Sequence, residues 1–370
     1  MYELFSISSS SGSTPIHVSN DPLPAIAGRF SGANAIVDAR FADMLRDVAP
    51  SLIAITADEL HKSLDSIPVI LKACRDGGLT RDGRIVAIGG GIIQDIASFV
   101  ASVYMRGVQW DYVPTTLLAM VDSCIGGKSS INVGPYKNLA GTFHPPASIV
   151  VAPDLVSTLS PSQIASGLCE ASKICYAKDV ESFQHYLTLH AAFKAGDPDA
   201  LPQLISHSLA CKKWFIEIDE FDRAERLLLN FAHSFGHAIE SATNFEVEHG
   251  VAVGVGMLAA LSYSETFHPA LGEIDEIALL ERHVLEILAT LPRLPRQLDQ
   301  VEQEKFTYYF ANDKKHTQTA FRPVLLTASG RLERRPIARD AKAEQAIWHG
   351  FDVARNQLRK VVDGAKVHVS

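Results

Sequence analysis

The chain has 370 residues, enough for two ordinary domains or one large α/β unit. Hydrophobic residues make up 47% of the sequence and charged residues 21%, a globular composition that excludes intrinsic disorder over most of the chain. A formal net charge of −8 provides no broad basic field, which argues against nucleic acid or an acidic membrane surface as a partner.

No apolar run reaches the roughly 20 residues that span a bilayer, and the N-terminus lacks the apolar segment of a secretion signal. The cysteine count is odd and no CxxC pair occurs, so neither a disulfide framework nor a four-cysteine zinc site is expected. We therefore expect a cytoplasmic protein in which the cysteines are small buried apolar residues: Cys74, Cys124, Cys169, Cys175 and Cys211.

The first half alternates short apolar runs with helical patterns, after a Ser-rich segment at 8–11 that is typical of a turn or a mobile stretch. Strands are expected over 35–37, 52–55 and 84–88, and helices over 66–74 and 92–105. Strands that alternate with helices predict a mainly parallel sheet.

The second half changes character after the strand expected over 149–151. Helical periodicity covers 162–178, 200–215 and 225–243. We predict an α/β domain over 1–155 and a mainly helical domain over 156–370, with the cleft between them as the default place for chemistry.

A glycine run follows the strand expected over 84–88. Gly89, Gly90 and Gly91 stand before a helix, where glycine lets the backbone approach a pyrophosphate and the helix N-terminus favours an anion. Because the run is not GxGxxG, a simple tight turn is an equal alternative. Asp95 could bind a ribose or serve the first helical turn.

A denser block follows at 114–128, PTTLLAMVDSCIGGK, with Lys137 and Asn138 beyond it. It places a flexible glycine pair beside Lys128 and an acid, Asp122, six residues earlier. Lysines and an asparagine around glycine turns suit an anionic, oxygen-rich ligand. The alternative is an ordinary solvated lysine loop.

The second half contains a candidate metal site. His233 and His237 form HxxxH, which places two imidazoles on one face of a helix. His249 follows in a turn, and Glu170 lies in an earlier helix with Lys173 one turn on. Three His/Glu ligands and an open position would suit a catalytic zinc ion, although paired histidines often only cap or pack. The missing glutamate of HExxH argues against a zincin protease.

Taken together, these motifs resemble the sugar phosphate cyclases, most closely the 3-dehydroquinate synthase branch. In chain order, over roughly residues 35 to 325, they are GGGxxxD, RGV, PTTLLAxVDSxxGGK, KN, CE–K, RxxLNxxHxxGHAIE, HGxAVxxGM and DKK. The resemblance implies an α/β fold with an N-terminal Rossmann-like NAD-binding domain and a mainly α-helical C-terminal domain that binds metal and substrate.

The resemblance also implies the cofactors, NAD and a divalent cation, usually zinc, with cobalt or iron(II) as chemical alternatives for the same donors. The implied metal ligands are Glu170, His233 and His249, whereas His237 faces the substrate phosphate. The implied NAD contacts are Asp38, Glu59, Lys62, Gly90, Gly91, Asp95, Thr115, Thr116, Lys137 and Thr158.

The implied substrate is a small sugar phosphate, a heptulosonate 7-phosphate that is cyclised with loss of phosphate and no net redox change. Its phosphate would meet Lys128, Asn138, Asn230 and His237, with Arg106 supplied by the second subunit of a homodimer. Lys212 and Arg226 would hold its carboxylate, with Lys314 or Lys315 nearby, and Asp122 and Lys173 would address its hydroxyls.

Three alternatives remain open: a sibling cyclase acting on sedoheptulose 7-phosphate or an amino analogue in secondary metabolism, a metal-dependent polyol dehydrogenase, and a noncatalytic NAD or sugar-phosphate sensor. Two cations at the carboxylate positions, Lys212 and Arg226, favour an acidic substrate. The sequence departs from the family pattern beside the implied contacts: Gln94 and Ala232 stand where glycine is common, Cys169 where alanine is common, and Ser129-Ser130 where Thr-Gly is usual.

Overall fold

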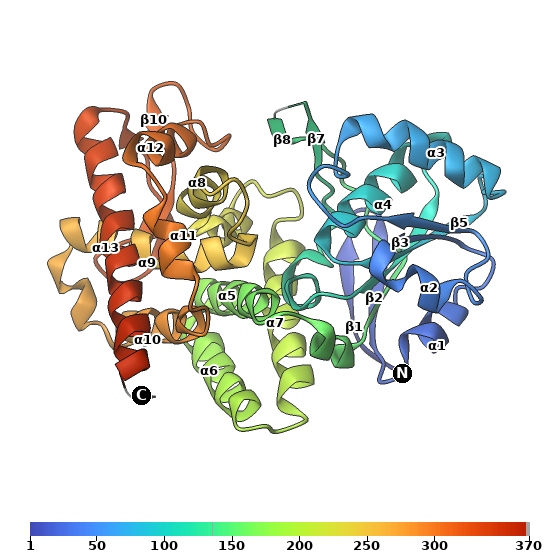
Figure 1. Ribbon diagram of the computed structural model, residues 1–370, viewed down its shortest axis with the longest axis horizontal. Helices are drawn as coiled ribbons and strands as arrows, with labels where there is room; N and C mark the ends of the chain where they lie inside the picture. The colour runs from blue at the N-terminus through green and yellow to red at the C-terminus, as the bar shows by residue number, and fades with distance from the viewer. Residues whose placement is uncertain (135, 368–370) are drawn as a thin grey trace. The chain divides into compact units, whose positions relative to one another are not determined.

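The computed structural model describes residues 1–134 and 136–367. The chain forms two compact units, each with its own elements (Figure 1). Unit 1 comprises Met1–Thr158 and Leu201–Glu220, and unit 2 comprises Leu159–Ala200 and Phe221–Ser370. The chain first leaves unit 1 at residue 158, close to the expected boundary at 155, and residues 201–220 group with unit 1.

Unit 1 is built on a seven-stranded sheet with the order β1-β2-β9-β6-β5-β3-β4. All neighbours are parallel except the β1–β2 hairpin, which confirms the expected mainly parallel sheet. The strands are β1 (Tyr2–Ser9), β2 (Gly12–Val18), β3 (Asn34–Asp38), β4 (Leu52–Ile55), β5 (Arg84–Gly89), β6 (Gln109–Pro114) and β9 (Ser148–Val151), with a separate hairpin β7 (Ile131–Val133) and β8 (Tyr136–Ala140).

The middle strands of this sheet are apolar because both faces are covered. Every residue of β3 is buried, and so is every residue of β5 after Arg84, as is typical of parallel sheets flanked by helices. The expected turn is confirmed in the Ser-rich segment: residues 8 and 9 end β1, and residues 10 and 11 form the hairpin turn.

The helices of unit 1 follow the predicted pattern, with α3 and α4 close to the expected 66–74 and 92–105. They are α1 (Leu23–Gly28), α2 (Ala42–Leu45), α3 (Ile67–Asp76), α4 (Gly91–Val103) and α7 (Ala200–Ile218), with 3₁₀ turns η1 (Ala39–Phe41), η2 (Leu64–Ser66), η3 (Tyr104–Arg106) and η5 (Pro153–Thr158). A short π-helix, η4 (Ala119–Ser123), lies in the motif block.

Unit 2 is mainly helical, as expected, and adds two small strand pairs. Its helices are α5 (Pro161–Lys178), α6 (Val180–Lys194), α8 (His233–Ala242), α9 (His249–Phe267), α10 (Asp275–Ala289), α11 (Leu294–Asp299), α12 (Gln303–Ala311) and α13 (Ala341–Val367), with 3₁₀ turns η6 (Glu225–Asn230) and η7 (Pro269–Glu273). The paired strands are β10 (Ala320–Phe321) with β13 (Ile337–Ala338), and β11 (Val324–Leu326) with β12 (Leu332–Arg334).

Helix α9 is the central element of unit 2 and contacts α5, α8, α10 and α13. Its length and composition alone would allow it to cross a membrane, but 78% of its most apolar stretch is buried inside the protein, as in a core helix. Glycines bring it against α5: a Cβ on Gly250 would lie 2.1 Å from the Ser166 carbonyl oxygen, and one on Gly254 would lie 2.6 Å from Cys169 Sγ.

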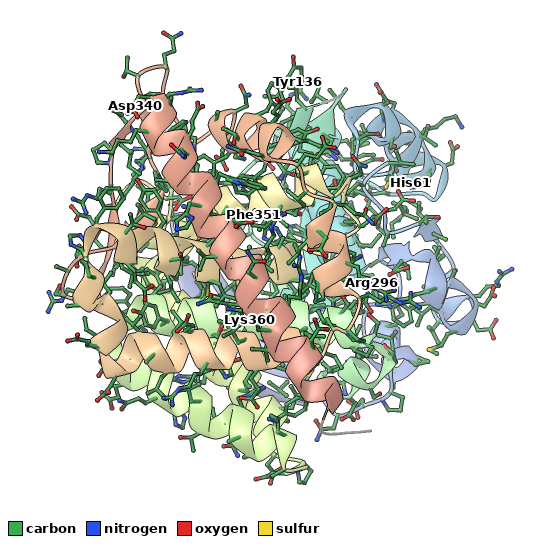
Figure 2. The ribbon with its side chains drawn as sticks, turned by 60° about the vertical axis from the view of Figure 1, so that its left-hand side comes forward. His61, Tyr136, Arg296, Asp340, Phe351 and Lys360 are labelled. Atoms are coloured by element: carbon green, nitrogen blue, oxygen red, sulfur yellow. The ribbon has the colours of Figure 1, made fainter. Side chains whose placement is uncertain are left out.

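The last helix, α13, covers part of this core. Figure 2 shows it running from Asp340 past Phe351 to Lys360. Phe351 stacks on Phe306 of α12, with ring centroids 4.7 Å apart and an interplanar angle of 15°. Buried aromatic contacts of this kind explain why the C-terminal segment forms one long helix.

The prediction of one helix over 225–243 was wrong. A 3₁₀ turn ends at Asn230, and α8 begins at His233. Ala232 between them has φ +69°, a left-handed conformation that ends helical hydrogen bonding and that suits glycine better than alanine. Apolar periodicity does not register a single left-handed residue, so the break was invisible in the pattern.

Candidate metal and cofactor sites

Three side chains of unit 2 converge as the sequence predicted. Glu170 lies in α5, and His233 and His249 are the first residues of α8 and α9, so the predicted turn at His249 is the start of a helix. Their ligand atoms lie within 4.8 Å of one another. Glu170 Oε1 is 3.7 Å from His233 Nε2 and 3.4 Å from His249 Nε2.

These separations match a tetrahedral ion. Zinc bonds to nitrogen and oxygen of about 2.0–2.1 Å imply ligand-to-ligand edges of about 3.3 Å. The donor set of one carboxylate and two imidazoles therefore fits a divalent cation with little movement, and it leaves a fourth position for another ligand.

Both imidazoles are oriented through their other nitrogen. His233 Nδ1 lies 3.1 Å from the Phe231 carbonyl oxygen, and His249 Nδ1 lies 3.0 Å from Glu240 Oε2. Since a carbonyl or carboxylate oxygen accepts, Nδ1–H donates in each case. In the neutral form of either ring, Nε2 is therefore the nitrogen with the lone pair that a metal ion needs.

The second carboxylate oxygen of Glu170 also has a partner. Lys173, one turn further along α5, donates to Glu170 Oε2, and both side chains are buried. Burial, followed by the positive charge of Lys173, holds the pKa of His233 well below its usual range. Burial also acts to lower the pKa of His249, but the combined effect of Glu240 and Glu170 outweighs it and raises that pKa to about 10.

His237 lies beside this cluster, with ring centroids 5.5 Å from His233 and 5.8 Å from His249. Its Nδ1 lies 2.9 Å from Asp313 Oδ2, and Lys315 Nζ lies 3.2 Å from the same oxygen. Burial and the charge of Lys315 lower the pKa of His237. His237, Glu240 and His249 also have donor atoms within 4.8 Å of one another, but Glu240 already orients His249 through Nδ1.

The predicted cofactor residues of unit 1 follow neighbouring strands. Asp38 ends β3, Gly90 and Gly91 follow β5, and Thr115 and Thr116 follow β6. From β3 the sheet grows through β4 on one side and β5 on the other, so the strand order reverses at the β3–β5 pair. In open α/β sheets, ligands bind outside the carboxyl ends of strands at such a reversal.

Gly90 is required by its surroundings. It precedes the first residue of α4, and a Cβ there would lie 2.8 Å from Thr116 Cγ2. The absence of a side chain lets the backbone of this turn come close to the residues after β6. That is the close approach expected of a phosphate-binding glycine.

The charged residues predicted around the cofactor pair with one another. Lys62 Nζ lies 2.6 Å from Asp95 Oδ2, and Lys137 Nζ lies 3.2 Å from Glu59 Oε1. Asn132 Nδ2 donates to Glu59 Oε2 at 2.8 Å. The four charged residues thus form two ion pairs. Thr158 ends η5, and its hydroxyl donates to the Leu155 carbonyl oxygen.

Asp122 of the motif block forms an ion pair with a buried lysine of another element. Lys212 of α7 lies 2.5 Å from Asp122 Oδ1 and donates to the Asp122 carbonyl oxygen at 2.6 Å. Asp122 belongs to the π-helix η4, a form that often occurs at functional sites. Lys128 bridges to Phe143 in an antiparallel pair. Asn138 has φ +52° and donates its backbone N–H to Asn132.

The remaining predicted residues lie in short turns. Arg226 is 4% exposed in η6, so it is a buried arginine. Asn230 ends the same turn and donates to the Leu227 carbonyl. Arg106 is exposed in η3, the expected connection between α4 and β6, with φ +70°.

Sequence reasoning missed two carboxylates that orient histidine rings, Glu240 and Asp313. A signal existed for Glu240, because His233, His237 and Glu240 are spaced i, i+4, i+7 on one helical face. Asp313 stands first in the DKK motif, but only the three-dimensional fold brings it to His237, 76 residues away.

The sequence matches two family models, described as 3-dehydroquinate synthase N-terminal over residues 52–166 and 3-dehydroquinate synthase C-terminal over residues 167–316. A relative from Xylella fastidiosa (strain M23), a 3-dehydroquinate synthase, is 33% identical over 350 residues, covering 89% of this chain and 92% of that protein.

Two solved structures share the fold. One is 2-epi-5-epi-valiolone synthase from Streptomyces hygroscopicus subsp. jinggangensis 5008 with NAD⁺ and Zn²⁺ bound, with a TM-score of 0.78 and 24% identity over 95% of this chain and 99% of that chain. The other is 2-deoxy-scyllo-inosose synthase complexed with carbaglucose-6-phosphate, NAD⁺ and Co²⁺, with a TM-score of 0.77 and 20% identity at the same coverage.

Proposed function

This chain belongs to the 3-dehydroquinate synthase family, and from that premise we propose that it is a carbon–oxygen lyase. It cyclises a heptulosonate 7-phosphate with elimination of phosphate and uses NAD and a divalent cation. The observation that carries the proposal is the Glu170, His233 and His249 cluster, whose donor spacing fits a tetrahedral ion.

The cation is assigned to this cluster as Zn²⁺ or Co²⁺. Imidazole and carboxylate donors suit either ion, and the two solved structures contain one ion each. His237 is kept out of the ligand set, because the histidines whose Nε2 lies within 4.0 Å of Glu170 Oε1 among the described residues are His233 and His249.

NAD is assigned to the crevice at the carboxyl ends of β3, β5 and β6. Gly90 and Gly91 allow the pyrophosphate to approach the N-terminus of α4. Asp38, which ends β3 and pairs with Arg40, is assigned to a ribose hydroxyl. The Lys62–Asp95 and Lys137–Glu59 pairs, with Thr115, Thr116 and Thr158, complete the proposed contacts.

When bound, the cation supplies Lewis acidity and the nicotinamide supplies reversible hydride acceptance. The chain's own residues bind and orient the substrate. Asp122 and Lys173 are assigned to the hydroxyls at the reacting carbons. A charged group that is already in position, such as the Lys173 ammonium, stabilises charge that develops during the reaction without having to reorganise.

The phosphate is assigned to Lys128, Asn138, Asn230 and His237, and to Arg106 of a second copy. His237 is suited to this role because Asp313 fixes its ring orientation. Holding the departing phosphate beside the carbon that loses a proton lets one of its own oxygens act as the base. Elimination then needs no separate general base.

The acidic substrate is proposed on two buried cations, Arg226 and Lys212, which are 4% and 8% exposed. A guanidinium fork matches a carboxylate. Lys212 also pairs with Asp122, and the guanidinium of Arg226 is the group that supports a heptulosonate over sedoheptulose 7-phosphate. Lys315, which pairs with Asp313, is assigned to the same carboxylate.

A homodimer is proposed from the surface around Arg106. Val103 and Met105 are 42% and 39% exposed, and Phe143 is 47% exposed in a segment tied to them by the Thr142–Ser102 hydrogen bond. Exposed apolar side chains in one patch mark an interaction site. A reducing, cytoplasmic location is proposed from the five cysteines, which are buried and form no disulfide among the described residues.

The proposal is tested by mixing the protein, Zn²⁺ or Co²⁺ and a trace of NAD with heptulosonate 7-phosphate. We expect many phosphates released per NAD, with no lasting rise in NADH absorbance. Stoichiometric NADH accumulation would instead indicate a dehydrogenase. Absence of phosphate release from any heptulose phosphate, with NAD still bound, would indicate a sensor.

A further inference from the structure

The π-helix η4 that contains Asp122 is held at its end by side chains of two other elements. Three of its last carbonyl groups, those of Val121, Asp122 and Ser123, accept hydrogen bonds from side chains. Ser208 of α7 donates to the Val121 carbonyl at 3.0 Å, and Lys212 of α7 donates to the Asp122 carbonyl at 2.6 Å.

The third carbonyl is bound from the opposite element, helix α4. Gln94 Nε2 donates to the Ser123 carbonyl oxygen at 2.6 Å, and Ser123 Oγ donates to Gln94 Oε1 at 2.7 Å. Because a carbonyl can only accept, the amide orientation is fixed by chemistry. The Gln94 side chain is buried, and one residue satisfies both of its polar atoms.

The reciprocal Gln94–Ser123 pair connects two proposed sites of unit 1, the NAD site at α4 and the substrate residue Asp122 in η4. Gln94 stands between Gly91 and Asp95, on the helix assigned to NAD, while Ser123 directly follows Asp122. The position is also one where this chain departs from the common glycine of the family pattern. A glycine there would leave Ser123 with neither partner.

We propose that Gln94 is a positioning residue for Asp122: its two hydrogen bonds to Ser123 cap the π-helix and fix the Asp122 carboxylate relative to the cofactor-binding helix. The inference rests on the proposed catalytic role of Asp122. Gln94 contacts no reacting atom in this scheme and acts only through the backbone of η4.

The first test is hydrogen–deuterium exchange of the full chain, which needs no substrate. In Gln94→Ala, the amides of 120–124 should exchange about tenfold faster, since the end of η4 loses one of its three side-chain donors. Ser123→Ala removes one of the two bonds and should show a smaller increase. The double variant should be no faster than Gln94→Ala alone, because both changes break one contact.

A matched control is Ser98→Ala on the same helix, which removes a buried bond from α4 to the His144 carbonyl and leaves η4 untouched. It should leave exchange of 120–124 unchanged. Gln94→Glu is isosteric but presents an oxygen to the Ser123 carbonyl, so it should be at least as damaging as alanine. Should Gln94→Ala not fold, Ser123→Ala and Gln94→Glu still decide the question.

The second test separates positioning from general loss of structure. With heptulosonate 7-phosphate, Gln94→Ala should lower kcat about tenfold, while KM and the NAD dissociation constant change less than about twofold. Unchanged exchange in 120–124, additive effects of the two alanines, or equal losses in Ser98→Ala would overturn the inference. If the wild type does not turn over this substrate, the proposed function fails, and the exchange result still decides the role of Gln94.

Discussion

The stability of unit 2 should fall in mild acid because of two buried histidines. His190 of α6 and His283 of α10 are each 5% exposed, and their ring centroids lie 4.7 Å apart. Burial, together with the nearby Lys194, lowers the pKa of His190 to about 4; burial, His190 and Lys194 lower that of His283 to about 3. The perturbation we choose is His190→Phe, which keeps an aromatic ring stacked on Tyr186.

The direction of the pH effect on stability follows from which state of the chain, folded or unfolded, binds more protons. An unfolded histidine titrates near 6.5, so between pH 6.5 and pH 4 the unfolded chain binds a proton that the folded chain does not. The free energy of unfolding therefore falls as pH falls, by about 1.4 kcal/mol per pH unit for each such group. For His190 alone the loss reaches about 3 kcal/mol at pH 4.

The assay is urea unfolding of wild type and His190→Phe at half-unit steps from pH 7 to pH 4.5. The wild-type free energy of unfolding should fall more steeply, by about 1.4 kcal/mol per pH unit, and the difference should grow below pH 6.5. The exposed His349 provides a control, His349→Phe, which should run parallel to wild type. If the free energies of unfolding of wild type and His190→Phe fall in parallel as the pH is lowered, the reasoning is refuted.

Three further outcomes are expected. Gly250→Ala should lower both the melting temperature and metal content, because its Cβ would lie 2.1 Å from the Ser166 carbonyl oxygen and would push α9 away from α5; calorimetry and metal analysis check this. His233→Ala should lose the bound cation, whereas His237→Ala should retain it, and equal loss in both would make the ligand assignment wrong. Sedimentation should give a dimer at micromolar concentration, and Arg106→Ala should lower phosphate release without changing bound metal.

Sequence patterns were sufficient to predict those elements whose signal lies in a short stretch of the chain. Apolar runs identified β3, β4 and β5, and the glycines after β5 marked the start of α4. The motif order identified the convergence of Glu170, His233 and His249, which lie on three separate helices. Few other folds need the residue types of these motifs in this order along the chain, so the motifs are specific.

The missed features depend on backbone conformation or long-range contacts. The left-handed residue Ala232 and the π-helix η4 leave no periodic trace in the sequence. Residues 201–220 read as part of a continuous helical half, yet they group with unit 1, where Lys212 meets Asp122. Asp313 reaches His237 only through the fold.

The measurement that tests the central proposal most directly is the ratio of kcat/KM for heptulosonate 7-phosphate to that for sedoheptulose 7-phosphate, followed by phosphate release. Wild type should favour the acid by about 100-fold or more, or about 2.8 kcal/mol at about 1.4 kcal/mol per tenfold, since the buried Arg226 guanidinium can bind a carboxylate that the neutral sugar lacks. Arg226→Ala should lower that ratio, because it should lower kcat/KM for the acidic substrate. A wild-type ratio near one would contradict the proposal and assign the chain to a neutral sugar phosphate.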